Sequence, residues 1–225
     1  MRPFLLALFS VLTLLAAACG DGGEDDAARE ASPAAHDTRP ATEAEIQALA
    51  SIPIPGYVTE QTGATLLGAA ATYHAAQKTA GGADLFVRAN FAPCDGFVCA
   101  SLDPKDYTAP AAQDGLKSVL PPAHRDNPAL LWEFGQVQLS SGARGLFYYA
   151  LSYLEGATTT GVSRSSVNTY RAWYHNGAVY VTLEVFARGT SSPLSRADVE
   201  KLMTRAEAER AARDVFAALE PQLPG

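Results

Sequence analysis

The side chains in this sequence that most readily do chemistry belong to three cysteines and four histidines. Two of the cysteines, Cys94 and Cys99, are separated by four residues. Such a pair can form a structural disulfide, act as a redox pair or supply half of a metal site. A redox pair usually has two intervening residues, and His74, His124 and His175 are scattered without ligand spacing. The spacing therefore favours a structural disulfide and predicts no metal site.

The third cysteine, Cys19, ends an amino-terminal segment with the layout of an export signal. Arg2 supplies a positive charge, residues 4–15 form an apolar run, and three alanines precede the cysteine. A signal peptidase requires such small residues before its cleavage site. The apolar run is shorter than the roughly 20 residues of a membrane span, which disfavours an uncut anchor. Plain secretion after cleavage near Ala18 is the main alternative to cleavage with lipid attachment.

This segment resembles the signal peptides of bacterial lipoproteins. In that family the cysteine sulfur carries a diacylglycerol, cleavage occurs just before the cysteine, and the new amine is usually acylated, for example with palmitate. The usual motif has leucine three residues before the cysteine, whereas this chain has Ala16 there and Leu15 one residue further out. The resemblance implies a membrane anchor through lipid on Cys19, facing the periplasm or the exterior. Gly20 directly after the cysteine favours the outer membrane.

Composition divides the chain into a signal peptide at residues 1–18, a tether at 19–42 and one globular domain at 43–225. The tether is rich in acidic residues and alanine and has almost no large apolar residue, so we expect it to be disordered. The formal net charge of the chain is -7, which argues against nucleic acid as a partner. The expected partners are the membrane, through covalent lipid, and an envelope protein or small ligand.

Hydrophobic periodicity predicts an α+β domain, with an antiparallel sheet of about six strands and helices packed on one face. Asn176-Gly177 is the strongest hairpin signal, and Ser-Ser-Gly-Ala at 140–143 is a second plausible tight connection. Asp95-Gly96, between the two cysteines, predicts a further hairpin that pairs 85–91 with 97–102 and whose tip the disulfide closes. The other strand-like segments are 65–77, 130–139, 144–154, 167–175 and 178–187.

The carboxyl-terminal region has the helical period and forms the final amphipathic helix of the domain. Ser195 with an acid three residues later marks the start of this helix. Thr204 and Glu207 form a second capping pair, which predicts a break near Met203 and a new start after it. The other expected helices are at 43–50 and 111–120.

This order of elements is similar to that of the PsbP-like domains of several small bacterial lipoproteins. The similarity lies in tyrosine-rich hairpins followed by a short helix and a final amphipathic helix. It covers residues 53–219 and rests on no diagnostic motif. It implies an accessory or binding role in the assembly of something larger, because such domains are not typically enzymes.

Aromatic side chains concentrated in the predicted hairpins form the candidate binding surface. Packing between neighbouring strands is the more common role of such residues. The functional interpretation is a groove of amphipathic rings for a peptide, a glycan or an apolar ligand. The residues concerned are Tyr148, Tyr170, Trp173, Tyr174 and Tyr180.

A search for catalytic residues gives mostly negative results. The chain lacks the local motifs of serine hydrolases, phosphate-binding loops, metalloproteases and dinucleotide-binding sites. The nearest polar cluster, Ser-Arg-Ser-Ser at 163–166, has the composition of a solvated loop between strands. A serine hydrolase that combines one of these serines with His124 or His175 is the alternative. We therefore expect a non-enzymatic binding or assembly role without a cofactor, and the alternative is an envelope hydrolase of a small ester, peptide or glycan.

Overall fold

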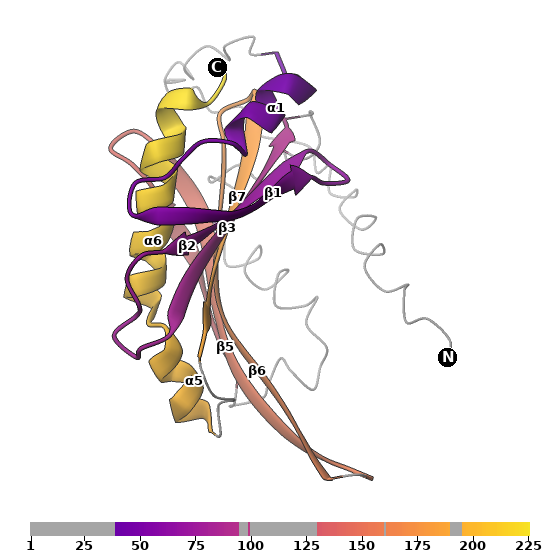
Figure 1. Cartoon of the computed structure of the whole chain (residues 1–225), viewed down its shortest axis with the longest axis vertical. Helices are drawn as coiled ribbons and strands as arrows, with labels where there is room; N and C mark the ends of the chain where they lie inside the picture. The colour runs from indigo at the N-terminus through magenta and orange to yellow at the C-terminus, as the bar shows by residue number, and fades with distance from the viewer. Residues whose placement is uncertain (1–38, 95–98, 100–129, 160, 190–194) are drawn as a thin grey trace, which may run out of the picture. The chain divides into compact units, whose positions relative to one another are not determined.

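The main element of the fold is one antiparallel sheet of seven strands (Figure 1). The structure, a computed structural model, describes residues 39–94, 99, 130–159, 161–189 and 195–225. The strand order is β1-β2-β3-β7-β6-β5-β4. The α+β class is confirmed, and the sheet has one strand more than the six or so expected. The strands are β1 (Tyr57–Ala64), β2 (Ala69–Ala75), β3 (Asp84–Pro93), β4 (Leu130–Gln138), β5 (Arg144–Thr158), β6 (Gly161–His175) and β7 (Val179–Arg188).

The sheet consists of two meanders, β1 to β3 and β4 to β7, that meet where β3 pairs with β7. This pairing runs from Asp84 opposite Arg188 to Pro93 opposite Val179. Because β2 occupies the other side of β3, residues 85–91 cannot pair with 97–102, and that predicted hairpin is wrong. The Asp-Gly signal concerns only the local turn. Placing β7 beside β3 extends the buried apolar surface of the core, and this burial stabilises the fold more than a local hairpin would. Residues 97–98 and 100–102 lie outside the described part.

The other two predicted turns are confirmed. At the β6–β7 turn, Gly177 has a φ of +92°, which glycine adopts without strain. The side-chain Oδ1 of Asn176 accepts hydrogen bonds from the backbone N–H groups of Ala178 and Val179, each at 3.0 Å. At the β4–β5 turn, the N–H of Leu139 donates to the carbonyl of Ala143 at 3.0 Å.

Two strand regions differ from the sequence prediction. Residues 163–166 lie in β6, with Arg164 opposite Glu155 of β5, and do not form a loop. Pairing with β5 satisfies the backbone groups that face it, so serines suffice there without an apolar pattern. β1 was also not predicted, because all its residues except Tyr57 are exposed and no alternation marks it as a strand.

Three helices and a short 3-10 turn complete the described part: α1 (Glu43–Leu49), α5 (Arg196–Leu202), α6 (Arg205–Leu219) and the 3-10 turn at Glu220–Gln222. The predicted break is confirmed, since Met203 is extended and Thr204 caps α6 with Glu207 in a capping box. The helix predicted at 111–120 lies outside the described residues.

The hydrophobic core lies between the sheet and these helices. On β7 the alternate residues from Val179 to Val185 are buried and the residues between them are only partly so. Helix α6 runs along this face of the sheet (Figure 1). There the rings of Phe216 and Tyr174 form a T-shaped contact with a centroid distance of 4.8 Å. From α1, Ile46 joins the same core.

A buried asparagine of β6 forms hydrogen bonds with the end of α5. The Nδ2 of Asn168 donates to the carbonyls of Val199 at 2.7 Å and Met203 at 2.9 Å. The hydroxyl of Tyr149 donates to the Met203 carbonyl as well, at 3.2 Å. The last four carbonyls of a helix have no partner within it, so a side chain from the sheet supplies a cap for α5.

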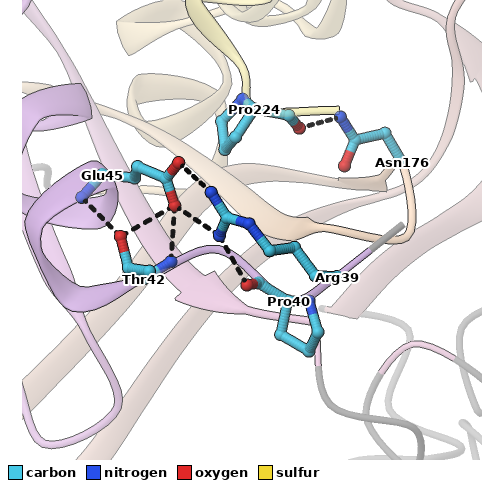
Figure 2. Close-up of polar contacts among 6 residues, drawn as sticks. All are labelled: Arg39, Pro40, Thr42, Glu45, Asn176 and Pro224. Atoms are coloured by element: carbon cyan, nitrogen blue, oxygen red, sulfur yellow. Dashed lines mark hydrogen bonds and ion pairs between the residues drawn. The ribbon is translucent and has the colours of Figure 1, made fainter. Parts of the chain in front are cut away.

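The start of α1 is held by a capping box that includes an ion pair (Figure 2). The carboxylate of Glu45 accepts hydrogen bonds from the backbone N–H of Thr42 at 2.7 Å and from its hydroxyl at 2.8 Å. Arg39 donates to both carboxylate oxygens, at 2.6 and 2.9 Å. The hydrogen bond from Arg39, followed by those from Thr42, lowers the pKa of Glu45 to about 2.

We expect Glu45→Gln to reduce the loss of stability that accompanies acidification. The pKa of Glu45 falls from its ordinary value of 4.5 to about 2 on folding. Its carboxylate therefore contributes stability above pH 4.5, and that contribution is lost as the pH falls toward 2. Urea unfolding at several pH values should show the variant less stable than the native chain at pH 7 and the difference closing toward pH 2. Glu43→Gln, in the same turn but outside the box, is the matched control, and an equal difference at all pH values would contradict the prediction.

Candidate functional site

The structure divides the predicted aromatic surface between the two faces of the sheet. Tyr170 is completely buried on the helix side, stacked on Phe147 at a centroid distance of 5.4 Å. Tyr174 lies on the same side, against Phe216. These two tyrosines belong to the core, because the alternation of β6 directs them beneath α6. Tyr148, Trp173 and Tyr180 lie on the opposite face and are partly buried.

On the face opposite the helices, charged and aromatic side chains form a row across the middle strands. The register places Tyr148, Arg171, Glu184 and Arg88 opposite one another in succession. Arg171 donates to Glu184 at 2.7 Å, and Arg88 lies 3.9 Å from the other oxygen of the same carboxylate. The guanidinium of Arg171 also lies over the Tyr148 ring, 5.7 Å from its centroid. The carboxylate of Glu184 is therefore shared between Arg171 and Arg88.

Beside this row, two phenylalanines form a stack that arginine covers. The rings of Phe86 and Phe186 are stacked at 5.4 Å, and His74 stacks on Phe86 at 4.6 Å. The guanidinium of Arg188 lies 4.9 Å from the Phe86 centroid and 5.4 Å from that of Phe186, and Arg88 lies 5.8 Å from Phe186. We call these five residues the arginine–aromatic patch.

Charge is unevenly distributed within the arginine–aromatic patch. His74 lies 3.4 Å from Glu60 and 3.7 Å from Asp84. Arg88 has Glu184 nearby, and its side chain is 45% exposed. Arg188 is exposed and pairs with no carboxylate among the described residues. A chain of net charge -7 therefore presents one unneutralised guanidinium on an aromatic stack.

Sequence reasoning did not single out the arginine–aromatic patch. The signal was present in β7, where Phe186 alternates with core residues and so points away from them. Arg188 lies at the end of that strand, and its contact with Phe86 depends on the non-local pairing of β3 with β7. Only the strand order brings these residues together.

The second group of reactive side chains contains the predicted disulfide. Cys94 and Cys99 are bonded, with their Cα atoms 5.6 Å apart, which is an ordinary separation for a disulfide. The structure adds His175, whose ring lies next to the two sulfurs. The sequence spacing gave no sign of this, because His175 comes from the end of β6. His124, the other histidine of the alternative hydrolase, lies outside the described residues.

The lipid-attachment residue Cys19 and residues 20–38 of the tether also lie outside the described part of the chain. The last four residues assigned to the tether, 39–42, are ordered instead: Ala41 is buried and Thr42 caps α1. Among the described helices, none has the length and apolar character needed to cross a membrane. Comparisons of the chain with protein-family models, with curated proteins and with solved structures found no match.

Proposed function

We propose that this chain is a lipid-anchored lipoprotein of the cell envelope whose domain binds a partner and has no catalytic role. The binding role is inferred from the position of Arg188. Its guanidinium covers two stacked phenyl rings and pairs with no carboxylate among the described residues. Stacking on the rings uses the flat face of the guanidinium and leaves the N–H groups at its edge able to donate. These N–H groups can bind a carboxylate through two hydrogen bonds. The partner that fits is an acidic polypeptide segment with apolar side chains.

The stability that these arginine–ring contacts contribute is too small to explain why the arginines lie over the phenylalanines. A cation–ring contact whose cation is exposed to solvent contributes only about 0.5 to 1 kcal/mol to stability. Arg88 and Arg188 are both exposed, Phe186 is only partly buried, and Phe86 is buried beneath Arg188. Arginine and aromatic residues are the types most enriched at protein interfaces. The similarity to PsbP-like domains, which implies an accessory role, supports the same proposal.

Photocrosslinking in cells tests the binding role. A benzoylphenylalanine at Thr72, which lies opposite Arg88 on β2, should give an adduct with one envelope protein. Arg188→Glu should reduce that adduct about tenfold or more, because the repelled carboxylate loses its partner. Arg210→Glu, which makes the same charge change on α6, should leave the adduct unchanged.

Ala217, exposed on α6, provides the control position for the crosslinker. An equal adduct from that position would contradict the proposal. So would an adduct at Thr72 that Arg188→Glu does not reduce. An adduct of twice the mass of the chain would identify a second copy as the partner, and an adduct with glycan alone would exclude a polypeptide.

The anchor is tested separately by the intact mass of the chain recovered from membranes. The proposal expects a chain that begins at Cys19 and carries the mass of a lipid. Cys19→Ser should move the protein into the soluble fraction. A chain that begins near Cys19 without lipid would make it a secreted protein, and an uncut chain would contradict the lipoprotein proposal.

A further inference from the structure

The cysteines and His175 form a group of ligand atoms at the end of β3, apart from the arginine–aromatic patch. The sulfurs of Cys94 and Cys99 and the imidazole nitrogen of His175 all lie within 4.8 Å of one another. The two cysteines are buried, with 6% and 7% of their surfaces exposed. Both ring nitrogens of His175 are buried as well. Two sulfurs and one imidazole are therefore gathered in a place shielded from water.

Hydrogen bonds fix the strand ends that carry these side chains. The N–H of Cys94 donates to the carbonyl of Ala178 at 2.9 Å, which ties the end of β3 to the start of β7. His175 immediately precedes the β6–β7 turn, and the turn residue Asn176 donates through Nδ2 to the carbonyl of Pro224 at 2.7 Å (Figure 2). The sheet and the carboxyl end of the chain therefore hold His175 beside Cys94.

We infer that Cys94, Cys99 and His175 form a metal site that becomes available when the disulfide is reduced. In the oxidised protein the sulfurs are bonded to each other, whereas the thiolate is the form of cysteine that binds metal. An external dithiol breaks the S–S bond: two electrons and two protons pass to the cysteine sulfurs, and the reductant leaves as its own disulfide. Metal binding then releases the two thiol protons to solvent.

The donor set selects a thiophilic cation, Cu(I) or Zn(II). Soft thiolate ligands favour these ions, and imidazole suits both metals. Two cysteines and one histidine leave the fourth position of tetrahedral zinc open. An imidazole binds a metal through one nitrogen, and the other nitrogen of a metal-bound histidine usually has a hydrogen-bonding partner. The site therefore binds a soft ion in the reduced protein and releases it on oxidation.

The test uses the full-length chain with Cys19→Ser, in which Cys94 and Cys99 are the only thiols. Oxidised protein and phosphine-reduced protein, freed of reductant without oxygen, are titrated with Cu(I) against bicinchoninate and with Zn(II) against a chromogenic chelator. Circular dichroism follows the fold. We expect a single ion per reduced chain, a retained fold, and binding to the oxidised chain that is about tenfold or more weaker. The Kd for each ion, calculated with the known affinity of its chelator, identifies the preferred ion.

His175→Gln tests the histidine, and His74→Gln on the same sheet is its matched control. The first variant should weaken binding by about tenfold or more and remove the histidine contribution from the X-ray absorption spectrum of the metal, and the second should do neither. If His175→Gln does not fold, His175→Asn takes its place. The inference is overturned if the oxidised chain binds equally well, if the histidine variant binds like the native protein, or if the reduced chain unfolds or binds neither ion.

Discussion

Gly145→Ala should lower the free energy of unfolding by about 3 kcal/mol, at the upper end of the usual cost of overpacking. Gly145 lies in β5, where the backbone of β6 passes close to its Cα. A Cβ atom at this position would overlap the backbone carbonyl oxygen of Trp173 and lie 2.9 Å from Cδ1 of Leu139. The leucine can change rotamer, but the carbonyl belongs to a paired strand. The two strands must therefore separate at Trp173.

Urea unfolding of Gly145→Ala beside Gly142→Ala measures this effect. Gly142 lies in the turn between β4 and β5, and a Cβ there would meet nothing within 4 Å. Its φ is not positive, so alanine should be neutral or stabilise the fold by up to about 1 kcal/mol, through lower entropy of the unfolded chain. Equal stability of the two variants would show that the close approach of β6 to Gly145 does not exist.

Asn168→Ala should also cost about 3 kcal/mol, because it leaves buried carbonyls at the end of α5 without a donor. Asn168 is only 8% exposed, and its Nδ2 donates hydrogen bonds to the carbonyls of both Val199 and Met203. Met203 keeps the hydroxyl of Tyr149, but no hydrogen bond is described that would replace Asn168 at Val199. We therefore expect α5 to lose its amide protection in hydrogen exchange before α6 does.

Asn168→Asp separates the hydrogen bonds from the shape of the side chain. Aspartate fills the same volume, but it brings no amide N–H and places a carboxylate against two carbonyl oxygens. Its cost at pH 7 should equal or exceed that of the alanine variant, as measured by urea unfolding. If aspartate is tolerated and alanine is not, the cavity and not the lost donor explains the destabilisation.

Local signals in the sequence predicted the local parts of this fold. The break between α5 and α6 follows from two capping pairs, at Ser195 and Thr204, each of which lies within four residues of sequence. The turn at Asn176 follows from the need for positive φ at Gly177. Such features are decided by neighbouring residues, so the sequence contains all the information that they need.

The pairing of β3 with β7 was not predictable in this way. Both strands have an apolar side, and periodicity does not say which strand lies beside which. The Asp-Gly turn signal favoured a local partner for β3, and a more distant one took its place. For the same reason, neither the contact of Arg188 with Phe86 nor the approach of His175 to Cys94 could be read from the sequence.

The junction of β3 and β7 also constrains how the chain can fold. The residues that pair there are separated by about a hundred positions, and such distant contacts are slow to form because a long loop must close first. β7 and α6 come last in the sequence, yet they complete the centre of the sheet and cover it. No amino-terminal fragment of the domain can therefore close its own core. Folding of the domain therefore has to wait for β7 and α6, the elements that are synthesised last.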